Sequence, residues 1–337
     1  MIPYAKPSIN HQDRKAVLDV LKTDFLTQGP KVEEFEKAIC KQVKAKYCIT
    51  TNSATSALHL ACIGLGIKKN DLVYVSAITF VASANCAKIL GAKIELVDIN
   101  LSDYNISINE LKKKLARAKK TNKLPKLVIV THMAGYPCDM KQINKLAKIY
   151  KFKIIEDASH AFGSHYLKKP IGSCQYSNIT VFSFHAIKNI TTGEGGCVTC
   201  NNQNILKKIT SLRSHGIIRK NRKMNGFKSL LYKQNSIGFN YRMNEIQAAL
   251  GLSQLKRLSQ FKKKRKNVLD KYLSNLKKNN HLLFPNYKHK DIFYHLVLLR
   301  FASSNIREKY IHLLNLNKIR VNFNYIPLFY FKGKKKY

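Results

Sequence analysis

The stretch FSFHAIKNITTGEGGCVTC, residues 182–200, holds a single lysine, Lys188, between two apolar runs. The residues before it (VFSF, 181–184) and after it (GGCVTC, 195–200) are typical of buried strands. Lysine is normally a solvated surface residue. A lysine between two buried strands therefore indicates a chemical role, because a partly desolvated amine attacks aldehydes and takes protons from carbon acids.

Strand-like segments continue on the N-terminal side of this stretch and alternate with amphipathic helical segments from about residue 30. The seven strand candidates are KYCIT (46–50), LVYVS (72–76), KIELVD (93–98), KLVIVTH (126–132), FKIIED (152–157), ITVFSF (179–184) and CVTC (197–200). This alternation predicts an α/β fold with a mostly parallel seven-stranded sheet covered by helices.

The texture of the chain changes after about residue 242. A long helical run over 243–278 is followed by the strand-like segments YHLVLLRF (294–301) and IRVNF (319–323). We therefore expect a large domain over 1–242 and a smaller C-terminal α+β domain over 243–337. We expect the smaller domain to be shortened, because the chain ends soon after IPLFYF in a lysine-rich tail.

The net charge of the chain is strongly positive, with 60 Lys and Arg against 19 Asp and Glu. A formal charge of +41 attracts nucleic acids and anionic membranes non-specifically. A specific nucleic-acid module needs a reading element as well, and the sequence has no zinc-finger spacing, basic zipper or RNP-like strand. We predict lysines spread over helix faces, with no specific nucleic-acid partner.

Cysteine spacing and hydropathy bear on the metal sites and the location of the protein. The eight cysteines are predicted to be free thiols, and Cys197 and Cys200 to be core residues of a strand, because no second ligand pair completes a zinc site. No apolar run reaches the roughly 18 residues of a membrane helix, and the N-terminus does not resemble a signal peptide. A cytoplasmic protein without metal is expected.

Three further signals accompany Lys188. TNSATSALHL (51–60) follows a strand and begins a helix, so backbone N–H groups near Ala54 and Thr55 could bind a phosphate. Asp157 ends a strand at the edge where α/β proteins bind ligands, and Phe80 follows another strand. Taken singly, these are more often helix caps and a core ring. Together they describe pyridoxal phosphate, with a phosphate cradle, a pyridinium partner, a stacking ring and a reactive lysine.

Several separated motifs resemble one enzyme family. SFHAIKNITTGEGG, EDASHAFGS, NSATSALHL, LTQGPKVEEFE and GFNYRMNEIQAALGLSQL (238–255) are similar to segments of the DegT/DnrJ/EryC1/StrS sugar-nucleotide aminotransferases. The resemblance covers about residues 3–330 and implies a fold-type I transferase that depends on pyridoxal phosphate. Within the family, NSATSAL, SFHAIKNITT and NEIQAALGLSQL most resemble the branch that serves pseudaminic acid synthesis.

The resemblance implies roles for individual residues. Lys188 would bind the cofactor aldehyde and move protons, and Asp157 would pair with the pyridine nitrogen. His160 would contact the oxygen on the cofactor ring, and Phe80 would stack on that ring.

The family also implies how the cofactor phosphate is held. Ser183, Ala54 and Thr55 would bind it from one subunit. Asn240, in the G-x-N-x-R motif 238–242, would reach it from the partner subunit. The site would then be complete only in a homodimer.

The substrate implied by the resemblance is UDP-2-acetamido-2,6-dideoxy-β-L-arabino-hex-4-ulose, aminated at C4 with L-glutamate as donor. Two alternatives stay open from the sequence. Another nucleotide 4-keto sugar, of the GDP-perosamine or dTDP-sugar type, would use the same chemistry. A shortened, inactive homologue would instead serve as a binding or regulatory protein.

Overall fold

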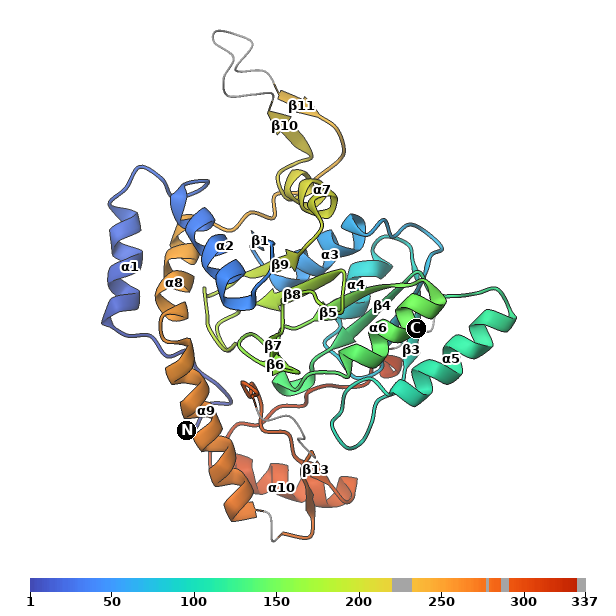
Figure 1. Ribbon diagram of the computed structural model, residues 1–337. Coiled ribbons are helices and arrows are strands. Elements are labelled where there is room, and N and C mark those ends of the chain that lie inside the picture. Colours follow the sequence, from blue (N-terminus) through green and yellow to red (C-terminus); the bar gives the residue numbers. More distant parts are fainter. Residues whose placement is uncertain (220–231, 277–278, 286–290, 332–337) are drawn as a thin grey trace.

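The computed structural model describes residues 1–219, 232–276, 279–285 and 291–331. A central sheet lies between two layers of helices, and α9 runs from this body to a smaller group of elements that contains α10 and β13 (Figure 1). The hairpin of β10 and β11 projects beyond α7, away from the sheet. None of the helices within these ranges is long and apolar enough to cross a membrane.

The helices and strands follow the predicted order. The helices are α1 (His11–Leu21), α2 (Pro30–Val43), α3 (Ala54–Gly64), α4 (Ala82–Lys88), α5 (Ile108–Lys120), α6 (Met140–Tyr150), α7 (Gln203–Arg213), α8 (Glu245–Leu255), α9 (Leu258–Leu276) and α10 (Ser304–Leu316), with short 3-10 turns at Met133–Gly135 and Leu328–Tyr330. The strands are β1 (Tyr47–Thr51), β2 (Leu72–Ser76), β3 (Lys93–Val97), β4 (Leu127–Thr131), β5 (Lys153–Asp157), β6 (His165–Tyr166), β7 (Lys169–Pro170), β8 (Ile179–Ser183), β9 (Gly196–Cys200), β10 (Ile217–Arg219), β11 (Tyr232–Gln234), β12 (Leu282–Leu283) and β13 (Arg300–Phe301).

The main sheet has seven strands in the order β1-β9-β8-β5-β4-β2-β3. All neighbouring pairs are parallel except those of β9, which pairs antiparallel with β1 and β8. Each predicted strand is present, so the prediction of a mostly parallel seven-stranded α/β sheet is confirmed. Cys197 and Cys200 lie buried on β9, as predicted.

Both faces of the sheet are buried under helices. Successive residues of each strand point to opposite faces, so they belong to two different core clusters. Tyr74 belongs to the same core cluster as Leu111 of α5 and Ile143 of α6, whereas its neighbour Val75 belongs to the cluster that contains Leu58 of α3. One core cluster therefore joins the sheet to α2, α5, α6 and α8, and the other joins it to α3, α4 and α7. This double cover explains why the strands are continuous apolar runs.

The strand-like segments of the C-terminal part are mostly not strands. Of YHLVLLRF only Arg300–Phe301 is a strand, paired with β12. IRVNF makes a single parallel bridge, between Ile319 and Ile2 of the N-terminal arm, and Val321 and Phe323 are exposed. The prediction of two strands here was wrong in extent, because β-branched residues form a strand only where a neighbouring strand accepts their hydrogen bonds. The end of the lysine-rich tail, 332–337, lies outside the described residues.

The long helical run is divided into α8 and α9 after Leu255, and α8 packs against α1 and α2. Asp13 of α1 is fully buried and accepts hydrogen bonds from Ser253 (2.6 Å) and Gln254 (2.8 Å), and it forms an ion pair with Arg257. These contacts tie the start of the predicted C-terminal domain to the first helix. The division at residue 242 stays a prediction.

Substituting Gly251 of α8 with alanine is expected to lower the free energy of unfolding by about 1–3 kcal/mol. A Cβ atom at Gly251 would lie 2.5 Å from the ring of Phe35 in α2, which is fully buried. Denaturant unfolding measures the loss. In the double variant Gly251→Ala, Phe35→Leu, the smaller side chain should remove part of the clash, so purely additive losses would contradict this account.

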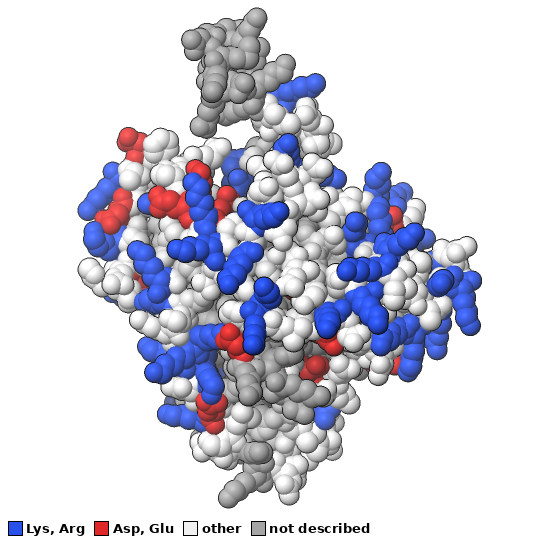
Figure 2. Space-filling view, viewed as in Figure 1, with Lys and Arg blue, Asp and Glu red and all other residues white. Residues whose placement is uncertain are grey.

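Basic side chains are distributed over much of the face shown in Figure 2, among few acidic ones. Several of them pair with acidic side chains on the same helix, as Lys15 does with Asp19 and Lys37 with Glu33. Exposed pairs of this kind contribute little to stability. Figure 2 fits the predicted spread of lysines over the surface.

Candidate active site

Four parallel strands end in a polar residue at the same edge of the sheet. Ser76, Thr131, Asp157 and Ser183 are the last residues of β2, β4, β5 and β8. All four are buried. Since open α/β sheets bind ligands outside the carboxyl ends of their strands, this edge is the place to look for a cofactor.

The carboxylate of Asp157 is held by hydroxyl groups on both oxygens. Ser83 of α4 donates to Oδ2 (2.5 Å), while the hydroxyl and backbone N–H of Ser159 donate to Oδ1 (2.6 and 3.1 Å). Ser83 is in turn 2.9 Å from Thr79, which is 2.7 Å from Thr131. Uncharged donors fix the orientation of the carboxylate, and among the described residues no cation forms a hydrogen bond or ion pair with it.

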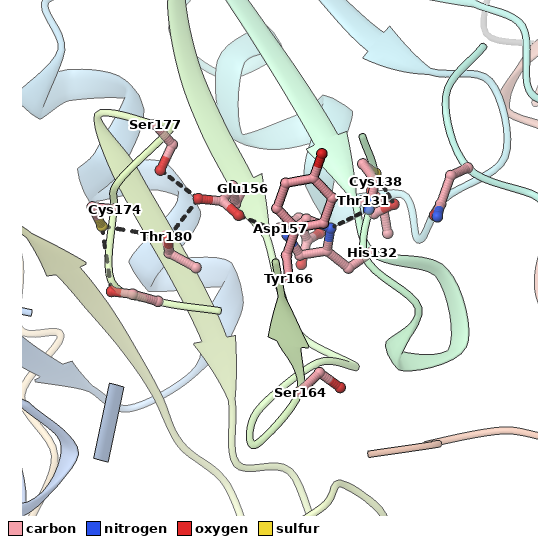
Figure 3. A network of polar contacts seen from close by, with 12 residues as sticks. Thr131, His132, Cys138, Glu156, Asp157, Ser164, Tyr166, Cys174, Ser177 and Thr180 are labelled. Atoms are coloured by element: carbon pink, nitrogen blue, oxygen red, sulfur yellow. Dashed lines mark hydrogen bonds and ion pairs between the residues drawn. The ribbon is translucent and has the colours of Figure 1, made fainter. Parts of the chain in front are cut away.

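The neighbouring carboxylate, Glu156, points to the other side of β5. His132 Nε2 lies 2.8 Å from Oε2, and the hydroxyls of Ser177 and Thr180 donate to Oε1 at 2.5 and 3.0 Å (Figure 3). Because His132 Nδ1 accepts the N–H of Cys138, its Nε2 carries the proton that is donated to Glu156. Glu156 of β5 thus links the end of β4, through His132, to β8, through Thr180.

Lys188 lies in the loop between β8 and β9, and its side chain is half-buried. Burial lowers the pKa of its amine to about 8; the carboxylate of Asp157 opposes this shift, and the cation of Arg265 adds to it. The side chain of Asn189 donates to the backbone oxygens of Phe162 (2.9 Å) and His160 (3.4 Å), which anchors the loop. At pH 7 about a tenth of the Lys188 amine is therefore an unprotonated nucleophile, which is far more than for a solvated lysine.

The loop ends in two adjacent glycines, at positions where a side chain would clash with neighbouring atoms. A Cβ atom at Gly195 would lie 2.2 Å from Thr192 Oγ1, and one at Gly196 would lie 2.5 Å from the backbone nitrogen of Ala54. Gly196 also pairs with Ser183 across β8 and β9. The absence of side chains thus brings Ser183 and the start of α3 together.

The first turn of α3 supplies donors that an anion could use. Ser53 caps the helix by accepting the N–H of Ser56 (3.1 Å). The N–H groups of Ala54 and Thr55 make no hydrogen bond to any described residue, and Thr55 is exposed. Free N–H groups at a helix N-terminus favour a phosphate.

His160 is buried and uncharged. Its Nδ1 accepts the N–H of Ala134 (3.3 Å), so its Nε2 carries the proton and donates to the hydroxyl of Tyr325 (2.8 Å). Burial, together with the cation of Lys188, holds the pKa of His160 well below its usual range. The ring of His295 packs against it with the centroids 4.5 Å apart.

The remaining two predicted residues differ in their surroundings. The ring of Phe80 is 54% exposed, and its centroid lies 5.8 Å from that of Tyr325. Asn240 is exposed and pairs through its backbone with Ser214, and no hydrogen bond joins it to the other predicted site residues in the described chain. Its role across a subunit interface stays a prediction.

These residues fit pyridoxal phosphate. The free N–H groups of α3 lie beside Ser183, and a carboxylate held by uncharged donors lies at the end of β5. An exposed aromatic ring and a half-buried lysine complete the set. Sequence reasoning did not predict a role for five residues that contact this set: Ser83, Ser159, Arg265, His295 and Tyr325. Only Ser159 had a local signal, since it follows Asp157 within EDASHA.

Comparisons with known proteins identify the family of the chain. Residues 7–336 match the model of the DegT/DnrJ/EryC1/StrS aminotransferase family. The chain belongs to this family, and it is a sugar-nucleotide aminotransferase that depends on pyridoxal phosphate.

Several individual proteins are similar to this chain in sequence or structure. Over 293 residues the chain is 41% identical to the UDP-4-amino-4,6-dideoxy-N-acetyl-beta-L-altrosamine transaminase of Campylobacter jejuni, covering 86% of this chain and 73% of the relative. Helicobacter pylori PseC, an aminotransferase involved in the biosynthesis of pseudoaminic acid, superposes with a TM-score of 0.89 at 31% identity, covering 98% of this chain and 86% of that one. The PLP-form of the sugar aminotransferase Spr1654 from Streptococcus pneumoniae gives 0.86 at 29% identity, covering 97% and 86%.

Removing the hydroxyl of Ser83 is expected to weaken cofactor binding by about tenfold or more, since a hydrogen bond to a charged group contributes about 1.5–3 kcal/mol. In Ser83→Ala, Oδ2 of Asp157 loses its only side-chain donor among the described residues. Absorption titration with pyridoxal phosphate measures the effect. Thr79→Val is the matched control, because Thr79 contacts Ser83 but not the carboxylate. Equal affinities in all three proteins would contradict a positioning role for Ser83.

Proposed function

We propose that the protein aminates C4 of UDP-2-acetamido-2,6-dideoxy-β-L-arabino-hex-4-ulose with L-glutamate as the donor. The observation that carries the chemistry is the half-buried amine of Lys188, with a pKa of about 8, within electrostatic range of the buried Asp157. The choice of sugar is supported by the 41% identity to a transaminase whose product is the corresponding 4-amino sugar nucleotide.

The division of labour follows from the contacts of each side chain. Pyridoxal phosphate, when bound, supplies an electron sink for the carbon that carries the reacting nitrogen. Asp157 would hold a proton on the pyridine nitrogen, and Ser83 and Ser159 keep its carboxylate in place. Lys188 would bind the cofactor aldehyde and afterwards move a proton between the carbon of the donor and that of the cofactor. His160 presents a neutral imidazole, and Ser183 with the start of α3 would bind the phosphate.

The assembly and location are part of the same proposal. We propose a homodimer in which Asn240 of each subunit reaches the phosphate bound by the other. Its exposure and its lack of hydrogen bonds to the described site residues support this arrangement. The location proposed for the enzyme is the cytoplasm.

The first test is the visible absorption spectrum of the protein with pyridoxal phosphate, before and after L-glutamate. A bound-cofactor band that glutamate bleaches supports the amino-transfer activity. The bleached protein is then mixed with the UDP-linked 4-keto sugar and, in parallel, with GDP- and dTDP-linked 4-keto sugars. Recovery of the band with the UDP sugar alone supports the proposed substrate. A band that no amino donor bleaches would overturn the proposal.

A further inference from the structure

Arg265 of α9 is hydrogen-bonded to the loop that contains Lys188. Its Nη2 donates to the backbone oxygen of Ile187 (3.3 Å), the residue just before Lys188, and its Nη1 donates to the backbone oxygen of His295 (2.7 Å). A guanidinium has five N–H groups. Two of them are used in these contacts, so others are left for a ligand.

The charge of Arg265 has no anionic partner among the described residues. Other partly buried arginines do have one, since Arg213 pairs with Glu36 at 2.7 Å and Arg257 pairs with Asp13. Burial lowers the pKa of Arg265, and its cation lowers that of Lys188 in turn. A partly buried cation without a counter-ion is costly. Such a group at a reaction centre indicates that the ligand brings the opposite charge.

The described groups around Arg265 include neutral rings and no anion. Burial holds the pKa of His295 well below its usual range, and its Nδ1 is buried without a hydrogen-bond partner in the described structure. Burial also raises the pKa of Tyr4, whose hydroxyl donates to Asn324 at 3.0 Å. Among the described residues, the titratable groups that interact with Arg265 are therefore the neutral rings of Tyr4 and His295 and the amine of Lys188.

We propose that Arg265 binds the α-carboxylate of the amino donor. This inference rests on the proposed function. In an amino acid, the carboxylate is attached to the same carbon as the amine that is transferred, so it always lies close to the reaction centre. In a nucleotide 4-keto sugar, the pyrophosphate is separated from the reacting C4 by the sugar ring. A cation tied to the peptide group before Lys188 suits the first anion better than the second.

The test compares L-glutamate with isoglutamine in the half-reaction that bleaches the cofactor band. Isoglutamine has an uncharged amide in place of the α-carboxylate and keeps the amine and the side-chain carboxylate. In wild-type protein the donor dissociation constant for glutamate should be lower than that for isoglutamine by about 10- to 100-fold. In Arg265→Gln this preference should nearly vanish, and Arg265→Lys should restore part of it. The ratio of the two donors cancels a general loss of active protein. Lys264→Gln removes the same charge from an exposed position one residue away and should keep the preference.

A second readout does not need the cofactor. The reaction of Lys188 with a small amine-modifying reagent, followed by mass spectrometry, reports how its reactivity depends on pH. Loss of the cation in Arg265→Gln should move the midpoint upward from about 8, whereas Lys264→Gln should leave it in place.

Three outcomes would overturn the inference. Arg265→Gln could keep the wild-type preference for glutamate over isoglutamine. With glutamine as a third donor, which has an amide in place of the side-chain carboxylate, Arg265→Gln could instead lose the preference for glutamate over glutamine. That result would assign Arg265 to the side-chain carboxylate. The variant could also bind the donor normally and lose only the keto sugar, which would assign Arg265 to the pyrophosphate. If wild-type protein reacts with no amino donor, the proposed function fails first.

Discussion

Replacing Lys188 with alanine is expected to abolish turnover and to leave part of the cofactor affinity in place. Lys188 is the half-buried amine at this edge of the sheet, and its pKa of about 8 makes it both a nucleophile and a proton carrier near neutral pH. General acid–base catalysis alone contributes roughly 10²- to 10⁴-fold. Because the same side chain would also bind the cofactor aldehyde, we expect the rate to fall by more than about 10⁴-fold.

Cofactor binding should survive in part because the other contacts come from separate elements. Asp157, Ser183 and the start of α3 do not depend on Lys188 for their positions. Absorption titration gives the affinity, and single-turnover mixing with glutamate gives the rate. Lys148→Ala, at an exposed position of α6, is the control and should match the wild type. Transamination by Lys188→Ala at the wild-type rate would show that another group does the chemistry.

The sheet could be predicted from the sequence because its strands are buried on both faces. Segments such as LVYVS (72–76) must then be apolar throughout, and the helices between them carry a regular apolar face. In the C-terminal part, IRVNF has the same β-branched texture but only one bridge to a neighbour. Whether such a segment becomes a strand depends on a partner more than 300 residues away in the chain, which local patterns do not encode.

The site divides in the same way. Asp157, Ser183 and Lys188 lie at or just after the ends of predicted strands, so their place at one edge followed from the topology. Arg265 and Tyr325 come from α9 and the C-terminal segment, and only the fold brings them to Ile187 and His160. A residue that acts through long-range packing has no local sequence signature. Arg265 is an example, because it lies in a lysine-rich segment of α9 that the sequence alone suggests is a solvated surface.

Replacing Asp157 with asparagine is expected to lower the turnover rate by roughly 10²- to 10⁴-fold. Asp157 is buried, and its carboxylate is fixed by Ser83 and Ser159, with no cation in hydrogen-bond contact within the part of the chain that the structure describes. Breaking a buried charge pair costs about 3–5 kcal/mol, which corresponds to that range of rates. The amide cannot hold a proton on the pyridine nitrogen near neutral pH. Added acid supplies that proton, so part of the lost activity should return as the pH falls.

Glu156→Gln is the matched control, because this neighbouring carboxylate is equally buried but points to the other side of β5. Its contacts with His132, Ser177 and Thr180 join three strands, so its loss should lower the free energy of unfolding by about 1–3 kcal/mol. Turnover by the folded fraction should change little. Asp157→Asn should show the reverse, with stability near the wild type and a changed pH profile. If both variants lost turnover equally, the charge of Asp157 would have no special role, and its effect would be one of folding.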